Sequence, residues 1–450
     1  MVSYSAMKPV STFNIWRLTW PTILSNIAFM LTGLVFLKIA GGMGIDEVAA
    51  VTTGQRLFFI LFAVMMGLSS GTTALVGRYW GAGDKERAGR VASLSVIIFF
   101  VDGLLLSWIA IPFLEPLVSI FSLTPEAQAL AVDFIFYTVL YAPPLLIVLV
   151  FSMAFRATGD SKTPLWVALV GAVLGIYLGI AFTYGWHGIK AAGLSGLAIG
   201  NGVAAIITVT IFLLLWLLGK LSFKPANPIP DFLESGRDLV KIGMPAAIEQ
   251  VFFQAGLLVF LVFLASYGNA AFATYGIGLS ILGLMIVIAF SFSISSATLV
   301  SQYLGAGDKK GAYNAGWRTM RTCVYIMIAG GLVMSYFAEE IARFMIDDPE
   351  VIALMVPFTY IISCSLPLMG IEFSMAGALR GAGDTRYPMM VTMFSIALSR
   401  ILVPFILVQI GADVMWLYAT SLLDFGIKSS LNMRRFRRKD WLNVQQPVSQ

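Results

Sequence analysis

Long apolar runs separated by short polar loops make up almost the whole chain. A helix needs about 20 apolar residues to cross the hydrocarbon core of a bilayer, and the chain offers twelve such runs. The runs are continuous rather than alternating with a period of two, which argues against a transmembrane β-barrel. The pattern therefore predicts an all-α integral membrane protein with twelve transmembrane helices. The predicted spans are 17–41, 57–77, 93–115, 132–154, 164–186, 193–217, 243–266, 278–300, 321–338, 351–377, 389–410 and 412–433.

The composition points in the same direction. Hydrophobic residues make up 58% of the 450 residues and charged residues only 12%, about half the charged fraction of a soluble domain. The mean hydropathy is +0.87, which is more apolar surface than one soluble core of this size can bury. The first apolar run is too long for the hydrophobic part of a signal peptide, so we expect it to be the first membrane span.

The positions of lysine and arginine set the expected orientation, because these residues are enriched in cytoplasmic loops. With the N-terminus placed inside, the inside segments hold 24 of the 29 basic residues, including Lys428 and the run Arg434–Lys439. The outside loops hold only Lys190 and Arg343. We therefore expect a multi-pass protein of the cell inner membrane with both termini cytoplasmic. The final basic run is expected to face anionic membrane lipid as a stop signal.

The second half of the chain repeats the first half at one constant spacing. Landmarks in the first half return in the second half without any gap in the register, which chance does not produce over so many positions. In one loop, Tyr79, Gly81, Gly83 and Asp84 return as Tyr303, Gly305, Gly307 and Asp308. In another, Arg156, Gly159, Asp160 and Pro164 return as Arg380, Gly383, Asp384 and Pro388. We call the spacing from Tyr79 to Tyr303 the repeat offset.

The repeat predicts two six-helix bundles. Six spans return the chain to its starting side, so the bundles should be related by a pseudo-twofold axis along the membrane normal, with a substrate cleft between them. We expect an N-terminal bundle at 1–218, a proline-bearing cytoplasmic linker at 219–240, a C-terminal bundle at 241–433 and a basic cytoplasmic tail at 434–450. We expect the protein to be a monomer.

Several functional classes are disfavoured by what the chain does not contain. It has one histidine, His187, and two cysteines, Cys323 and Cys364, both in apolar stretches. This set provides no metal cluster, disulfide framework or nucleophile and base. We therefore expect no cofactor, no metal and no enzymatic activity. The basic residues are explained by topology, so the net charge of +5 does not indicate a nucleic-acid partner.

Ionisable residues at membrane depth are the main functional candidates, because each costs about 2.5–3.5 kcal/mol to insert. Glu249 lies eight residues after Lys241, and Glu372 lies eight residues before Arg380. At a rise of 1.5 Å per residue both carboxylates should lie about 12 Å from the cytoplasmic helix ends. Two carboxylates at one depth could share a proton or capture a cation. We therefore predict that Glu249 and Glu372 form a cation-coupling site; the alternative is that each bonds to Arg400, Gln250 or a hydroxyl group and holds helices together.

Five further residues are possible coupling or substrate-cleft residues. Arg400 and Asp424 are near mid-depth and could form a buried pair, and Gln250 follows Glu249 directly. Asp102 has no partner evident from the sequence. Lys38 lies near the outer end of the first span, where its side chain could reach the interface or act as a fixed positive charge.

The repeated loops resemble those of the multidrug and toxic compound extrusion (MATE) family. The segment Leu379–Pro388 is similar to the family's loop between its tenth and eleventh helices, and Gln302–Asp308 and Arg78–Asp84 look like the loops after helices eight and two. The segment Gly243–Gln250 looks like the start of the family's seventh helix. We interpret Arg156–Asp160 and Arg380–Asp384 as structural clamps at helix ends.

The resemblance implies secondary active export, in which a proton or a sodium ion is exchanged for an amphipathic, often cationic, organic compound. Many members carry an aspartate in the first helix, within a motif like Gly-Leu-Val-Asp-Thr. Here Gly33-Leu34-Val35 is followed by Phe36, so coupling should fall on the C-terminal half or on Asp102. The sequence leaves the substrate and the coupling ion open. The alternative function is a lipid-linked saccharide flippase of the same superfamily.

Overall fold

The computed structural model describes residues 12–121 and 123–443, and these are almost entirely helical. The expected cytoplasmic N-terminus and residues 444–450 of the predicted tail lie outside the described residues. Every predicted span falls on helical structure. Within the described residues, nine helices are long and apolar enough to cross a membrane, or eleven if each of two bent pairs is one span. The last predicted span, 412–433, is the more polar helix α17 (Val414–Arg438), which is not among them.

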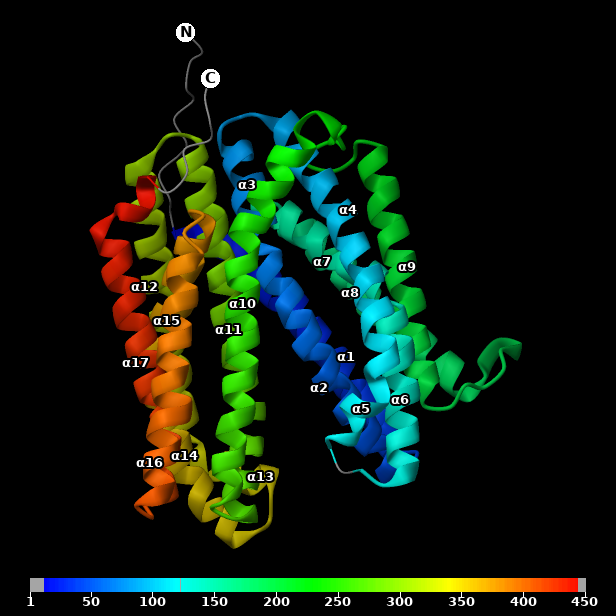
Figure 1. The fold of residues 1–450 in the computed structure, drawn as a ribbon, viewed down its shortest axis with the longest axis vertical. Coiled ribbons are helices and arrows are strands. Elements are labelled where there is room, and N and C mark those ends of the chain that lie inside the picture. Colours follow the sequence, from blue (N-terminus) through cyan, green and yellow to red (C-terminus); the bar gives the residue numbers. More distant parts are fainter. Residues whose placement is uncertain (1–11, 122, 444–450) are drawn as a thin grey trace. The chain divides into compact units, whose positions relative to one another are not determined.

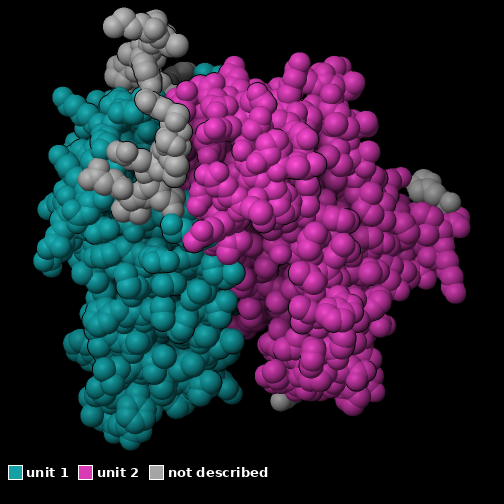
Figure 2. All heavy atoms as spheres, turned by 45° about the horizontal axis from the view of Figure 1, so that its top comes forward, with its two compact units in different colours: residues 1–19, 241–450 teal, residues 20–240 magenta. Residues whose placement is uncertain are grey.

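The chain divides into two compact units, which Figure 2 shows in different colours. We call residues 20–240 the N-terminal unit and residues 1–19 with 241–450 the C-terminal unit. Helix α1 (Thr12–Gly41) contributes its first residues to the C-terminal unit and the rest to the N-terminal unit. The division after Val240 falls at the end of the predicted linker.

The N-terminal unit contains the remainder of α1, the eight helices from α2 to α9 and the first residues of α10. Figure 1 labels these helices. Helix α6 meets α7 at Tyr141 with a bend of 53°, next to prolines at the start of α7. The eight helices are α2 (Ile45–Leu68), α3 (Ser70–Gly81), α4 (Lys85–Ala110), α5 (Leu114–Ser119), α6 (Pro125–Leu140), α7 (Ala142–Ala157), α8 (Lys162–Tyr184) and α9 (Ser195–Leu217).

The predicted linker packs onto the N-terminal unit. Phe223 stacks on Phe155 of α7, with ring centroids 4.9 Å apart, and meets Trp216 of α9 edge to face. Asp231 forms an ion pair with Arg90 of α4, at 2.9 Å between Oδ2 and Nη1. A short 3-10 helix at Ile229–Asp231 leads into α10, which begins at Phe232 inside the segment expected to be a linker.

The C-terminal unit is organised around one long helix, α14. It packs against α11, α12 and α17, so residues on several of its faces are buried. The helices of this unit are α10 (Phe232–Ala265) from residue 241 onward, α11 (Asn269–Gly305), α12 (Lys309–Tyr336), α13 (Ala338–Met345), α14 (Pro349–Gly381), α15 (Arg386–Ile396), α16 (Val403–Gln409) and α17. Helices α15 and α16 are joined by the π-helical segment η4 (Ala397–Leu402).

The predicted repeat is visible in local structure. Helix α4 begins at Lys85 and α12 begins at Lys309, which are equivalent positions under the repeat offset. The side chain of Asp84 accepts a hydrogen bond from the Arg87 amide, and Asp308 accepts one from the Gly311 amide. These aspartates are N-caps that satisfy free amides at the helix starts. Each follows a glycine with positive φ, a conformation that other residues rarely adopt.

The predicted basic tail begins as a continuation of α17 rather than as a separate segment. Phe436 lies against Tyr313 of α12, and Trp441 stacks on Phe436 with ring centroids 4.6 Å apart. The indole of Trp441 donates a hydrogen bond to the Phe436 carbonyl. Lys439 adopts φ 63, which turns the chain back so that Trp441 can bury its ring.

Close contact between α8 and α9 depends on glycine. A methyl group added at Gly200 would meet the backbone of Leu178 and Gly179, an approach typical of small residues between membrane helices. We predict that Gly200→Ala lowers the free energy of unfolding by about 1–3 kcal/mol, because backbones would have to separate. Gly426→Ala is the matched control, since nothing lies within 4 Å of its added methyl group. The check is the unfolding temperature in detergent; equal temperatures for the two variants would contradict the packing.

Candidate functional site

Six charged side chains gather inside the C-terminal unit, in four neighbouring parts of the fold. We call them the charged cluster: Glu249 on α10, Glu372 and Arg380 on α14, Arg400 on η4, and Asp424 and Lys428 on α17. Three are acidic and three are basic, so the cluster is neutral when all are ionised. The acidic members and Lys428 are buried. Charges at such depth are expensive unless they are paired, and pairing accounts for most of the contacts.

Glu249 is held by two neighbours through one oxygen. Its Oε1 accepts a hydrogen bond from Arg380 Nη2 at 2.7 Å and another from the Thr392 hydroxyl on α15 at 2.9 Å. The second oxygen, Oε2, is buried and has no hydrogen-bond partner within the described residues. Glu249 therefore joins three helices and keeps one acceptor unused.

Asp424 is the most fully paired carboxylate of the cluster. It lies 3.0 Å from Lys428 Nζ and 3.4 Å from Arg400 Nη2, and it accepts a hydrogen bond from the Ser395 hydroxyl at 2.7 Å. Lys428 also lies over the ring of Phe253, at 5.3 Å from its centroid, a favourable position for an ammonium group. Two cations on one carboxylate leave this part of the cluster with an excess positive charge.

Glu372 differs from the other two carboxylates. It is 7% exposed, and among the described residues its side chain makes no hydrogen bond or ion pair. The charged groups near enough to act on it are Lys428, Arg380, Glu249 and Asp424. The carboxylate of Glu372 thus lies without a bond near the excess positive charge that Lys428 and Arg400 leave around Asp424.

The π-helical segment η4 positions Arg400. Its wider turn interrupts the regular helix, an arrangement common at functional sites. The guanidinium of Arg400 lies 4.9 Å from the ring centroid of Phe260 and reaches Asp424 from there. Ser399, in the same segment, donates a hydrogen bond to the Ser395 carbonyl. The local distortion therefore directs a basic side chain into the unit.

The structure places the other predicted candidates outside this cluster. Gln250 is half-buried beside Glu249 on α10, and Lys38 is exposed near the end of α1. Asp102 lies in the middle of α4, where its Oδ2 is buried without a hydrogen-bond partner in the described part of the chain. The predicted mid-depth pair, Arg400 with Asp424, is present.

In each predicted loop clamp the arginine and aspartate side chains do not bond to each other. Asp160 accepts hydrogen bonds from the amide and hydroxyl of Thr163 and from the Ser222 hydroxyl. Asp384 pairs with Arg435 at 2.9 Å. Both aspartates therefore bond to partners other than the arginine of their own loop. Arg380 turns inward to Glu249, because an arginine in the last turn of a helix can reach back along its own axis.

Sequence reasoning missed Lys428, Thr392 and Ser395. The sequence places Lys428 among the basic residues expected on the cytoplasmic side. In the structure its side chain is buried, with 3% of its surface exposed. The available signal was its position four residues after Asp424, the spacing at which opposite charges meet on a helix. No sequence pattern distinguishes Thr392 or Ser395 from the other hydroxyl residues of the span.

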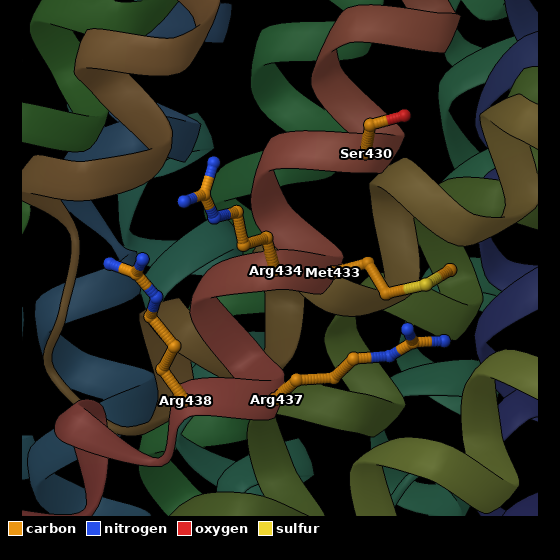
Figure 3. A pocket seen from close by; sticks show the side chains of 5 residues that line it. All are labelled: Ser430, Met433, Arg434, Arg437 and Arg438. Carbon is orange, nitrogen blue, oxygen red and sulfur yellow. The ribbon is translucent and has the colours of Figure 1, made fainter.

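A cavity of about 420 Å³ lies at the basic end of α17, away from the predicted coupling residues. Ser430, Met433, Arg434, Arg437 and Arg438 line it. Figure 3 shows Arg434 and Arg438 on one side of the helix and Met433 and Arg437 on the other. The position and basic lining of this cavity suit contact with an anionic surface rather than passage of a substrate through the protein.

Within the described residues, no group of three or more histidine, cysteine, aspartate or glutamate side chains could hold a metal ion. A multi-pass helical protein with a buried, nearly balanced set of charges belongs to the class of membrane transporters.

Comparison with known proteins identifies the family. The MatE family profile matches residues 21–181 and 245–406. The starts of the two matches, Pro21 and Pro245, are equivalent positions under the repeat offset. The chain therefore belongs to the MatE family, whose members are transporters and not enzymes.

Individual relatives agree over nearly the whole length. The probable multidrug resistance protein NorM of Thermotoga maritima is 27% identical over 94% of this chain and 92% of its own. The FAD transporter of Shewanella oneidensis is 22% identical over 79% of this chain and 78% of its own. A solved MOP superfamily transporter from Pyrococcus furiosus has a TM-score of 0.86 at 20% identity, covering 96% of both chains, a likeness of fold.

We expect Glu249 and Arg380 to be energetically coupled, so that their contributions to the free energy of unfolding are not independent. Arg380→Met leaves a buried unpaired carboxylate and should lower the free energy of unfolding by about 3–5 kcal/mol, whereas adding Glu249→Gln should restore part of it. The measurement is a double-mutant cycle by unfolding in mixed SDS micelles. If the losses of the two single variants simply add in the double variant, the two side chains are not coupled.

Proposed function

We propose that the protein is a secondary active multidrug efflux transporter of the inner membrane. It exchanges a cation, a proton or sodium, for amphipathic and mainly cationic organic compounds by alternating access, and it acts as a monomer. The name of one relative supports multidrug efflux, since the Thermotoga maritima protein is named a probable multidrug resistance protein. The charged cluster supports cation coupling.

The observation that carries this proposal is the unbonded carboxylate of Glu372. A carboxylate that is buried without a hydrogen bond gains little from remaining charged except the field of its neighbours. Two basic groups, Lys428 and Arg380, and two other carboxylates, Glu249 and Asp424, are the charged groups that act on it. A small helix movement changes the distances from Glu372 to these charged groups, so its carboxyl group can then gain or lose a cation. A coupling site requires this response.

The contacts of the cluster favour a proton over sodium. A sodium ion needs several oxygen ligands, but Glu249 Oε1 and the Asp424 oxygens already accept from arginine, lysine and hydroxyl groups. The remaining acceptors are Glu249 Oε2 and the Glu372 carboxylate. Two acidic groups near each other can share one proton. Binding that proton gives the cluster a net positive charge, which opposes simultaneous binding of a cationic substrate.

The N-terminal unit offers less at the corresponding place. Phe36 stands where many family members carry an aspartate, and it is 5% exposed in the core formed with Ala40, Val51 and Phe134. Its ring lies against Gly179 of α8, 3.3 Å from the position of an added methyl group. This position is apolar and tightly packed, which supports a coupling site in the C-terminal unit.

Glu372→Gln should abolish gradient-driven transport, because an amide has the size of a carboxylic acid but cannot exchange a proton. Proteoliposomes would be given a pH gradient or a sodium gradient separately, and movement of a fluorescent cationic dye would be followed. We expect the pH gradient to drive the wild-type protein and a loss of at least tenfold in the variant, on the order of removing one essential proton-transfer group. Glu340→Gln, at an exposed glutamate of α13, should transport normally.

The alternatives give different results. Transport driven only by sodium would replace the proton with sodium in the proposal. Undiminished transport by correctly inserted Glu372→Gln would place coupling elsewhere, with Asp102 the next residue to substitute. A wild-type protein that moves no dye under either gradient would favour the lipid-linked saccharide flippase.

A further inference from the structure

Arg156 is a buried cation in the N-terminal unit. It lies in the last turn of α7, which packs against α3, α4 and α9, and it is 5% exposed. The residues before it in α7, from Leu149 to Phe155, are all buried. The Arg156 side chain is therefore largely enclosed by protein, whereas a basic residue at a helix end usually extends its charged group into water.

The internal repeat shows what Arg156 lacks. Its equivalent, Arg380, bonds to Glu249, which also accepts from Thr392. Under the same repeat offset, the position of Glu249 holds Ser25 and the position of Thr392 holds Ala168. The Ser25 hydroxyl is engaged with the Pro21 carbonyl. The N-terminal copy therefore has the arginine, Arg156. It has no carboxylate at the position equivalent to Glu249, the partner of Arg380 in the C-terminal copy.

The described residues supply no substitute partner. Within residues 12–121 and 123–443, the Arg156 side chain makes no ion pair or hydrogen bond, and its Nε is fully buried without an acceptor. No charged side chain among them acts on it appreciably. Asp160, four residues away, is occupied by Thr163 and Ser222.

An arginine cannot escape this situation by losing its proton, since the guanidinium stays charged at any physiological pH. A buried charge without a partner is strongly destabilising, and an apolar side chain of the same size would serve packing better. The planar fork of a guanidinium matches the oxygens of a carboxylate or a phosphate. What is missing around Arg156 is one such anionic group.

We propose that Arg156 is the centre of an anion-binding site in the N-terminal unit, where it binds a phosphate or carboxylate group that does not belong to the chain. The anion takes the position that Glu249 occupies relative to Arg380. Its source is either a soluble compound or the headgroup of an anionic lipid, and the two share this chemistry. The inference does not depend on the coupling role of Glu372, because binding rather than transport tests it.

The first test uses inorganic phosphate as the probe. Purified full-length protein in nanodiscs of phosphatidylcholine would be heated with increasing phosphate at constant ionic strength, and the unfolding temperature would be recorded. We expect a saturable rise for the wild type and an apparent affinity about tenfold or more weaker for Arg156→Gln, as for the loss of one partner of a buried charge pair. Lys190→Gln, at an exposed basic residue outside the helices, should respond as the wild type does.

A second arm separates the two sources of the anion. Nanodiscs containing phosphatidylglycerol would be compared with phosphatidylcholine nanodiscs, without phosphate in solution. A rise in unfolding temperature that requires Arg156 and appears only with phosphatidylglycerol identifies a lipid headgroup. A rise with phosphate in phosphatidylcholine identifies a soluble anion. If neither anion stabilises the wild type more than Arg156→Gln, the proposal is overturned.

Arg156→Met guards against a variant that fails for structural reasons. It replaces the guanidinium with an apolar chain, so without any anion it should be at least as stable as the wild type. In the presence of the effective anion the order should reverse, because only the wild type gains. A methionine variant that is less stable than the wild type in phosphatidylcholine without phosphate, and by the same margin with either anion, would show that Arg156 has a purely structural role.

Discussion

The structure depends on one constraint: a charge inside a membrane protein must find a partner, because hydrocarbon provides no solvation. The C-terminal unit meets this constraint with three acidic and three basic side chains on four neighbouring parts of the fold. Asp424 takes two cations and a hydroxyl donor, and Glu249 takes one cation and another hydroxyl donor. Glu372 is left inside the resulting field without a bond of its own. The proposed function follows from that unequal distribution, since the fully paired groups are fixed and the unpaired group is able to respond.

The two copies of the repeat have used the same local structure differently. Their helix starts, aspartate caps and glycine turns agree in one constant register, which shows that the scaffold is shared. Most of the charges of the charged cluster are not shared, although the arginine at 156 and 380 is. Where the second copy has Glu249, Arg380 and Lys428, the first has Ser25, Arg156 and Ala204. The repeated local structure thus carries a charged cluster in one unit, whereas in the other the equivalent arginine, Arg156, lacks an acidic partner.

The sequence alone predicts the features that depend on long segments of the chain, namely the helices and the internal repeat. Apolar runs predicted the positions of the helices, and the constant register predicted the repeat. Glu249 and Glu372 could be selected because acidic residues are rare at membrane depth. Partner choice was harder, because it depends on side-chain reach and not on position alone. Arg380 looked like a loop residue although its guanidinium turns back to Glu249. Lys428 looked cytoplasmic although α17 buries it, and the π-helical turn that directs Arg400 toward Asp424 has no evident signature in the residues 397–402.

The central claim is that Glu372 exchanges its proton when a cationic substrate binds. The most direct measurement is the number of protons released when a cationic dye is added to purified protein in weakly buffered, sodium-free detergent solution. The account predicts that dye binding releases protons from the wild-type protein, that Glu372→Gln releases none, and that Glu340→Gln releases as many as the wild type. Equal proton release from the wild type and Glu372→Gln, with both proteins binding the dye, would contradict it.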